Sequence, residues 1–317
     1  MPAFLLAASI FGCFATSCLA QTSAIEPLAP RAVTQDRLEA PEPENWLSYR
    51  GNYAGWGFSP LDQINSENVG QMRNAWSFST GVDGGHESPP IVNDGVMYIT
   101  TPDNFLFALD ARTGDLTWMY EHDLPERLVA IHNTNRGVAL HGDRVFMATL
   151  DARILALDAK TGDKLWDVSV ADNATGYYMT TAPLTAEGLV MAGVSGGELG
   201  IRGFVVALEA ATGEERWRTH TVPAPGEFGS DTWPGETWRT GGAPVWLPGH
   251  YDQHSSSRTG VPEIRVLGSG ISATETTSIR TPCSRATSPQ EKYADTISIT
   301  GTGPGTGTKS RLRSSST

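Results

Sequence analysis

The sequence predicts an all-β fold in the form of a β-propeller. One motif, Ala-Leu-(Asp/Glu)-Ala-x-Thr-Gly closed by a Trp, occurs at 108–118, 156–166 and 207–217. The closing residues Trp118, Trp166 and Trp217 lie 48 and 51 residues apart, and periods of roughly 40 to 50 residues suit four-stranded propeller blades. Strand-sized apolar runs bounded by turn residues fill the intervals, as such blades require.

The strands of the first copy follow from its turns. Asp94-Gly95 separates the apolar runs 89–92 and 96–100, and Asp-Gly between such runs indicates a hairpin. A turn at 102–104 leads to a third run at 105–110, and Thr113-Gly114 leads to a fourth strand that carries Trp118.

The other two copies repeat this order. We expect strands at 140–143, 145–149 and 154–158 before Trp166, and a third set that starts at 182–183 and continues at 189–193 and 204–208 before Trp217. The middle turn of the third copy is enlarged by residues 195–203. An enlarged turn in one repeat is a common place for function.

Each position of the motif has a structural explanation. Gly takes the left-handed conformation of a tight turn, and Asp and Thr bind the turn backbone through their side chains. Ala leaves space beside a large ring. The Trp packs on the neighbouring unit, where its indole N–H needs an acceptor. Trp76 lies 42 residues before Trp118 and is expected to close an earlier, degenerate copy.

The first 43 residues are read as processing and leader segments. Residues 3–14 form an apolar run followed by small residues up to Ala20, which is typical of a signal peptide at 1–20. No Lys or Arg precedes Arg31, so a buried apolar N-terminus is the alternative. Residues 21–43 are rich in Ala, Pro and acidic residues and are expected to be an extended leader.

Composition excludes one class of partner. The formal net charge is −12, and nucleic acid binding needs a basic surface. We therefore expect no nucleic acid partner.

Several separate motifs, in a fixed order, carry a family resemblance. They are the strings at 45–53 and 58–69, the three repeats, Asn135-Arg136-Gly137 and the run 195–200. Together they resemble the quinoprotein alcohol dehydrogenases of the methanol/ethanol dehydrogenase type, over about residues 44–252. The resemblance implies an eight-bladed propeller that holds pyrroloquinoline quinone (PQQ) and Ca²⁺, or a lanthanide, in its central funnel. Residues 44–252 would then be about half of the ring.

The resemblance assigns cofactor contacts on one side of the funnel. Glu87 matches a carboxylate hydrogen-bonded to the quinone. Arg136 matches an arginine at the reactive carbonyl, where a fixed cation stabilises a developing oxyanion. Thr180 and Ser195 match hydroxyls that hold the cofactor's carboxylates.

It also assigns the metal ligand and the stacking platform. Gly196 and Gly197 match backbone that approaches the cofactor closely, and Trp246 matches the indole on which the planar cofactor stacks. Glu198 matches a metal-ligand carboxylate, a suitable hard donor for Ca²⁺. Ala130 and Ile131 stand where many members of the family have adjacent, disulfide-bonded cysteines, so an apolar lid is expected there.

Other aromatic and imidazole side chains receive no functional assignment. His86, His122, His132 and His141 show no metal-ligand spacing. Trp233 and Trp238, in the loop 223–239, could fill the core or line the funnel, and the sequence leaves both open.

After Asp252 the sequence changes character. Residues 252–317 contain 25 Ser and Thr among 66 residues and no Trp or Phe. We expect a low-complexity, disordered tail at 253–317, either natural or produced by a frameshift near Asp252. The family's catalytic base would lie beyond Asp252, so weak or no activity is expected from a truncated chain.

The resulting functional hypothesis is PQQ- and Ca-dependent oxidation of alcohols in the periplasm. The substrate would be a small-molecule alcohol. No Cys-x-x-Cys-His haem site occurs, so the electron acceptor would be a separate cytochrome c or quinone. The alternative is a non-catalytic periplasmic propeller scaffold of the outer-membrane assembly type.

Overall fold

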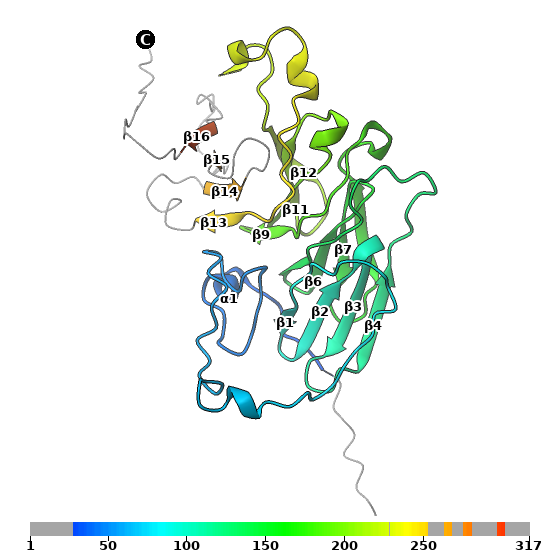
Figure 1. Cartoon of the computed structure of the whole chain (residues 1–317), viewed down its shortest axis with the longest axis vertical. Helices are drawn as coiled ribbons and strands as arrows, with labels where there is room; N and C mark the ends of the chain where they lie inside the picture. The colour runs from blue at the N-terminus through cyan, green and yellow to red at the C-terminus, as the bar shows by residue number, and fades with distance from the viewer. Residues whose placement is uncertain (1–27, 228, 253–262, 268–274, 281–296, 302–317) are drawn as a thin grey trace, which may run out of the picture.

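The computed structural model describes residues 28–227, 229–252, 263–267, 275–280 and 297–301. Four antiparallel sheets of four strands follow one another along the chain (Figure 1). The first sheet holds β1 (Ile91–Asn93), β2 (Val96–Thr100), β3 (Phe105–Asp110) and β4 (Leu116–Glu121). The second holds β5 (Val138–His141), β6 (Arg144–Ala148), β7 (Arg153–Asp158) and β8 (Lys164–Ser169).

The third sheet holds β9 (Leu184–Ala186), β10 (Leu189–Gly193), β11 (Phe204–Glu209) and β12 (Glu215–His220). The fourth holds β13 (His250–Asp252), β14 (Glu263–Leu267), β15 (Glu275–Arg280) and β16 (Ile297–Gly301). The short helices are α1 (Gln35–Glu39), η1 (Val69–Gln71), η2 (Pro102–Asn104), η3 (Asn173–Thr175), η4 (Gly197–Leu199), η5 (Ser230–Thr232) and η6 (Thr237–Thr240).

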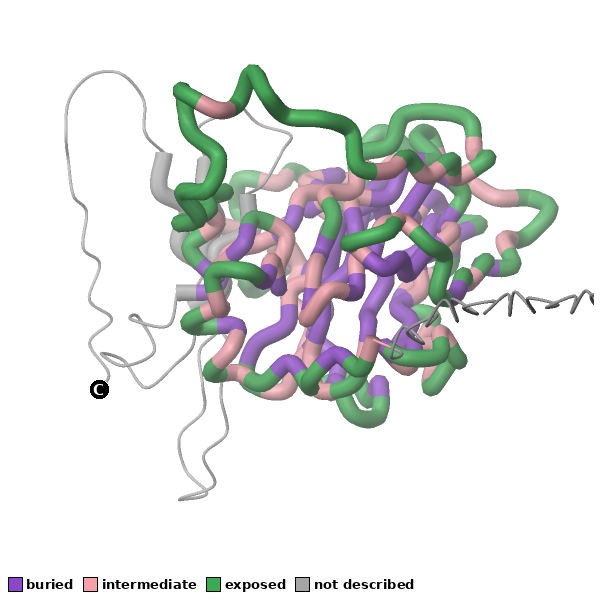
Figure 2. The backbone as a smooth tube through the Cα atoms, turned by 90° about the horizontal axis from the view of Figure 1, so that it is seen from below, coloured by how far each residue is buried: buried purple, intermediate pink, exposed green. Residues whose placement is uncertain are grey.

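The sheets are propeller blades, as the repeats predict. In every blade each strand pairs with the next strand in sequence, and the first strands of the later blades contact one another, β5 with β9 and β9 with β13. The buried residues concentrate on these central strands, and exposed loops surround them (Figure 2). The predicted all-β fold with a partial propeller is confirmed.

The turn chemistry of the motif is also confirmed. Gly114, Gly162 and Gly213 have φ of +77°, +77° and +78°, the left-handed region in which glycine is not strained. The first Ala of each motif lies directly opposite the Trp of its own blade, for example Ala156 opposite Trp166. A small residue at that position leaves space for the indole.

Each Trp fastens its segment to the next blade by one hydrogen bond. The indole Nε1 of Trp76 donates to the carbonyl of Ala111 at 3.1 Å, Trp118 to Ala159 at 3.2 Å and Trp166 to Ala210 at 3.2 Å. The acceptor is the second Ala of the motif in each case. Trp217 is different, because its buried Nε1 has no hydrogen-bond partner among the described residues.

The segment before the first blade is packed against the first two blades. Val33 forms a bridge with Gly142, and Trp46 forms one with Val92. Thr34 caps α1, and Leu38 within this helix is buried. The part of the expected leader that is described is therefore packed and partly helical, because its apolar side chains contact the core.

A charged cluster fixes the same segment to the turn between β1 and β2. Arg31 Nη2 lies 2.6 Å from Asp94 Oδ1, and Arg37 Nε lies 2.8 Å from Glu42 Oε1. Asn45 accepts a bond from the Asp94 backbone N–H at 2.7 Å through Oδ1. The Arg31 guanidinium holds the pKa of Asp94 well below its usual range, and burial acts in the opposite direction.

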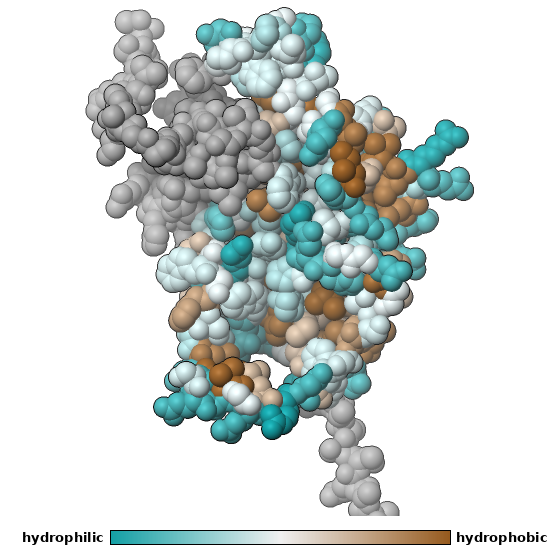
Figure 3. Space-filling model, viewed as in Figure 1, coloured by the Kyte–Doolittle hydropathy of each residue, from teal (hydrophilic) through white to brown (hydrophobic). Residues whose placement is uncertain are grey.

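Residues 54–75 are exposed almost throughout and carry large apolar side chains. Trp56 is 73% exposed and Phe58 is 68% exposed, and apolar surface lies at the lower end of Figure 3, where this segment runs in Figure 1. The expectation that Trp76 closes a degenerate blade is wrong in part. Trp76 docks as expected, but residues 74–80 pair with no strand among the described residues.

Two further findings concern membrane-spanning helices and the expected tail. Within the described ranges, no helix is long and apolar enough to span a membrane. Three stretches of the expected disordered tail form β14, β15 and β16. The rest of 253–317, and the proposed signal peptide at 1–20, lie outside the described residues.

Replacing Gly162 by Ala should destabilise the chain strongly. A Cβ at this position would lie 2.6 Å from Trp118 Cε3, and the left-handed backbone adds a cost of about 1–2 kcal/mol. Gly188 has φ of +75° and nothing within 4 Å of its Cβ position, so Gly188→Ala is a matched control for the backbone cost alone. Urea unfolding should show that Gly162→Ala lowers the free energy of unfolding by about 1–3 kcal/mol more than the control does. Equal decreases in the two variants would contradict the conclusion that Trp118 packs on Gly162.

Replacing Asp94 by Asn should lower stability in a pH-dependent way. A carboxylate with a depressed folded pKa stabilises above its unfolded pKa of about 3.9 and loses that contribution as the pH falls through the folded value. The free energy of unfolding of wild type should exceed that of Asp94→Asn by about 1–2 kcal/mol above pH 5, and the difference should shrink below about pH 4. Urea titrations at pH 3 to 7 test this, with Asp123→Asn, an exposed carboxylate, as the control. A difference that does not change with pH would contradict it.

Candidate functional site

Four of the predicted site residues precede the first strands of the four blades. Glu87, Arg136, Thr180 and Trp246 each lie within four residues of the start of β1, β5, β9 and β13, in that order. Repeated architecture therefore brings residues far apart in sequence to one end of the propeller. Between them lies a cavity of about 390 Å³.

The described residues that line this cavity come from all four blades. They are Gly85, Glu87, Ile131, His132, Asn133, Thr134, Arg136, Tyr178, Thr180, Ser195, Gly196, Glu198, Pro244 and Trp246. All the predicted site residues except Gly197 are among them.

Arg136 is the centre of the site. Its Nη1 donates to Thr180 Oγ1 at 2.7 Å, and its Nη2 lies 2.7 Å from Glu87 Oε2. The guanidinium carbon lies over the Trp246 ring, 4.6 Å from the ring centroid. Only 12% of the Arg136 side chain is exposed. The cation is thus oriented by a carboxylate, a hydroxyl and an aromatic face.

Local structure explains why Arg136 points into the cavity. The side chain of Asn135 is fully buried; its Oδ1 accepts from Thr100 Oγ1 at 2.7 Å, and its Nδ2 donates to the Ala148 carbonyl at 2.9 Å. Gly137 follows with φ of +115°, a conformation that disfavours other residues. The Asn-Arg-Gly sequence therefore anchors the backbone on both sides of Arg136.

Two buried hydroxyls continue the polar wall. Thr180 Oγ1 lies 3.2 Å from Ser195 Oγ, and each of the two residues is 3% exposed. The Ser195 backbone N–H donates to the Tyr178 carbonyl at 2.7 Å, which fixes the enlarged turn against the segment before β9. This wall can donate hydrogen bonds to carboxylate groups of a ligand.

The two glycines differ in their roles. A Cβ on Gly196 would lie 2.1 Å from the Gly176 carbonyl, and a Cβ on Gly197 would lie 2.7 Å from the Pro244 Cδ. Both positions thus require glycine for packing of the chain on itself. Gly196 lines the cavity, whereas Gly197 does not.

Glu198 supplies one exposed carboxylate to the cavity. Tyr178 beside it is only 2% exposed; burial raises the pKa of this phenol, and the Glu198 charge acts in the same direction. Among the described residues no three His, Cys, Asp or Glu side chains come together as a metal site. Of the two carboxylates that line the cavity, Glu87 is paired with Arg136, which leaves Glu198 as the candidate metal ligand.

The cavity fits a planar anionic cofactor. Trp246 offers an aromatic face, Arg136 a fixed cation, and Thr180 and Ser195 hydroxyls. The buried Thr134 Oγ1 has no hydrogen-bond partner in the described structure. A Cβ at Gly85 would meet nothing within 4 Å, so that wall is open toward the cavity. These features suit a ring system with carboxylates and polarised carbonyls.

Sequence reasoning missed several of the residues that line the cavity, among them Thr134 and Tyr178. Neither belongs to the repeated motif, and a lone Thr or Tyr gives no periodic signal. Trp233 and Trp238 do not line the cavity. Trp238 instead stacks with Arg202, 4.9 Å from the ring centroid, in the yellow loop at the top of Figure 1.

The four histidines differ in their surroundings. His122 Nε2 lies 3.0 Å from Asp151 Oδ1 in a buried pair. His132 alone of the four lines the cavity.

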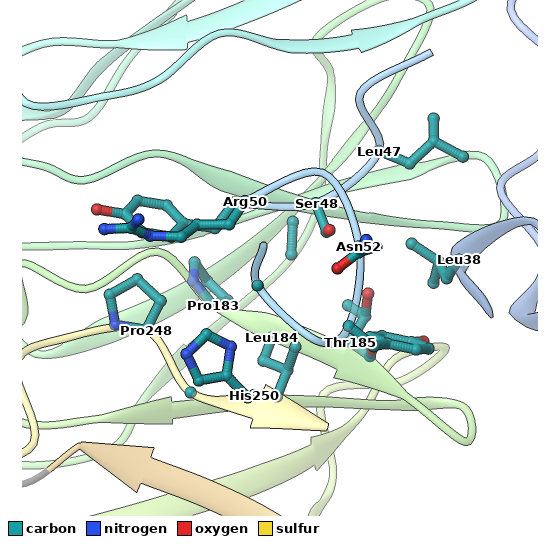
Figure 4. A pocket seen from close by; sticks show the side chains of 15 residues that line it. Leu38, Leu47, Ser48, Arg50, Asn52, Pro183, Leu184, Thr185, Pro248 and His250 are labelled. Carbon is teal, nitrogen blue, oxygen red and sulfur yellow. The ribbon is translucent and has the colours of Figure 1, made fainter. Parts of the chain in front are cut away.

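A second cavity, of about 20 Å³, lies between loop 47–55, β9 and residues 248–250 (Figure 4). It is lined by Ser48, Asn52 and His250 among others. Burial lowers the pKa of His250, and the charge of Arg50 acts in the same direction. A space of this size holds about one water molecule, so it cannot hold a cofactor.

Comparisons with known proteins agree with this geometry. Residues 46–256 match the PQQ family model described as the glucose/ethanol/alcohol dehydrogenase, beta-propeller domain. The chain is 36% identical over 265 residues to the quinoprotein alcohol dehydrogenase PedH of Pseudomonas putida, covering 77% of this chain and 44% of that protein.

Two solved structures are similar in fold and sequence. The quinohemoprotein alcohol dehydrogenase ADHIIG from Pseudomonas putida HK5 superposes with a TM-score of 0.69 at 36% identity, covering 78% of this chain and 40% of that one. A europium-containing methanol dehydrogenase superposes with a TM-score of 0.67 at 35% identity, covering 77% of this chain and 44% of that one. The chain thus spans less than half the length of the relatives that it matches.

Replacing Arg136 by Met should change the fluorescence of Trp246 without any ligand. The guanidinium lies on one face of the indole, so its removal should expose that face to collisional quenchers such as acrylamide. We expect a measurably larger Stern–Volmer constant in Arg136→Met than in wild type. In a Trp246→Phe background the same change should have no effect; an effect of equal size there would assign the signal to another Trp.

Proposed function

Because the chain belongs to the PQQ family of glucose/ethanol/alcohol dehydrogenase β-propellers, we propose that its cavity binds PQQ and takes part in the oxidation of alcohols. The observation that carries this proposal is the position of Arg136, held by Glu87 and Thr180 over the face of Trp246. Bound PQQ would supply the electron-accepting quinone that no protein side chain provides.

The residues of this chain would bind and orient the cofactor. Trp246 would form the stacking platform through the indole face that the Arg136 guanidinium does not cover. Thr180 and Ser195 would donate to the cofactor's carboxylates. Arg136 would direct its cation at a carbonyl oxygen where negative charge develops, and Glu87 would hold that cation in place. Gly196 would let the backbone approach the ring.

We propose that Glu198 contributes a ligand to Ca²⁺ or a lanthanide beside the cofactor. A carboxylate is a hard oxygen donor and suits both kinds of ion. One of the similar structures is described as a europium-containing methanol dehydrogenase, which supports the inclusion of lanthanides. The metal would polarise a carbonyl of the bound cofactor as a Lewis acid.

The cellular location, the substrate and the electron acceptor are also proposals. We place the protein in the periplasm, with a small alcohol as substrate and a separate cytochrome c or quinone as electron acceptor. The described cavity wall offers cofactor contacts from one side, and the chain spans 44% of the PedH relative. We propose that the catalytic base is not among the described cavity residues, so the chain alone binds PQQ but oxidises alcohols weakly or not at all.

The test is titration of the chain with PQQ in the presence of CaCl₂ or LaCl₃, followed by Trp fluorescence. We expect saturable quenching that depends on Trp246. Arg136→Met should weaken binding about 10- to 100-fold, the effect of one charge-assisted hydrogen bond. Arg112→Met, at an exposed arginine outside the cavity, is the matched control and should bind as wild type.

The alternative, a non-catalytic scaffold, makes the opposite prediction. Absence of saturable quenching under both metal conditions would favour that alternative. Rapid ethanol-dependent dye reduction by the chain alone would instead overturn the proposal that its catalytic base is missing from the cavity.

A further inference from the structure

An irregular segment, 129–136, forms one rim of the cavity. Four consecutive residues, 131–134, line the cavity together with Arg136, and no residue of the segment belongs to a strand. Ile131 is 46% exposed. We call 129–136 the rim segment. Irregular segments of this kind are normally more mobile than the strands beside them.

A single buried side chain fixes the start of the rim segment. Asn173 Oδ1 accepts from the Val129 backbone N–H at 2.9 Å, and Asn173 Nδ2 donates to the Val129 carbonyl at 2.8 Å. The same Nδ2 lies 2.8 Å from the Tyr177 carbonyl and 3.1 Å from the Leu150 carbonyl. The amide thus pairs with Val129 as a neighbouring strand would, and connects it to two other segments.

The rest of the rim segment has separate attachments. The Asp103 backbone N–H donates to the Asn133 carbonyl at 3.1 Å, and Asn133 Nδ2 donates to Asp103 Oδ1 at 3.2 Å. The buried Asn135 anchors the far end. Asn173 therefore holds the first residue of the rim segment, at the end farther along the chain from Arg136.

The rim segment contains no cysteine, so no disulfide can hold it at the cavity. Non-covalent contacts must do so, and Asn173 binds both backbone groups of its first residue, Val129. Asn173 is 9% exposed, so its bonds are shielded from water and an unpaired partner would cost about 1–3 kcal/mol.

We propose that Asn173 is a positioning residue that keeps the rim segment closed over the bound cofactor and so governs how slowly the cofactor leaves. This inference rests on the proposed binding of PQQ. Asn173 does not line the cavity, so it would act through Val129 and the rim and not by touching the ligand.

The experiment compares Asn173→Ala with Asn45→Ala. Asn45 is also buried, at 6% exposure, and also binds a backbone N–H and side-chain acceptors, but it lies outside the cavity. Loss of stability should be similar in the two variants. Only Asn173→Ala should raise the dissociation rate of PQQ, by about tenfold, with the quenching amplitude at saturation unchanged.

Hydrogen exchange of the protein without ligand provides a second readout. Amides of 129–134 should exchange faster in Asn173→Ala than in Asn45→Ala. An equal rise of the PQQ dissociation rate in both variants would overturn the proposal, and so would faster exchange without a change in that rate. If wild type binds no PQQ, the proposed function fails; the exchange data then still decide whether Asn173 holds the rim.

Discussion

The hydrogen bond that the indoles of Trp76, Trp118 and Trp166 each donate to an Ala carbonyl of the next blade is the constraint on which the rest of the structure depends. It joins Trp118 to Ala159 and Trp166 to Ala210 with nearly the same length. A glycine in the left-handed conformation lies beneath each ring. Because the same contact is repeated, successive blades are related by nearly the same rotation, and their first strands converge on one axis.

This convergence places the site. Glu87, Arg136, Thr180 and Trp246 come from different blades, yet they meet because each precedes a first strand. Any change in the blade contact would move these residues relative to one another, and bound geometry tolerates errors of only about 0.5 Å. The repeated motif therefore contributes to binding without contacting the cavity itself.

The sequence predicts the repeated part of this structure well. Turn residues and periodicity predict the strands of three blades, and Arg136 lines the same cavity as most of the other residues that the resemblance assigns to the site. Periodicity carries no information about a contact that occurs only once in the molecule. The bonds of Asn173 to Val129 join residues 44 apart, and an asparagine in a loop shows no preference for a distant partner. The segment around Trp76 shares the docking Trp of the repeats but pairs with no strand among the described residues.

The Trp-to-Ala hydrogen bond also gives the row of blades a direction. Three of the contacts have an indole donor on one side and a carbonyl acceptor on the other, and the acceptors are Ala111, Ala159 and Ala210. Trp217 departs from this pattern: its buried Nε1 has no hydrogen-bond partner among the described residues, although a fourth sheet follows it in the chain. Within the described structure, the third and fourth sheets are therefore joined without the indole hydrogen bond that joins the preceding ones.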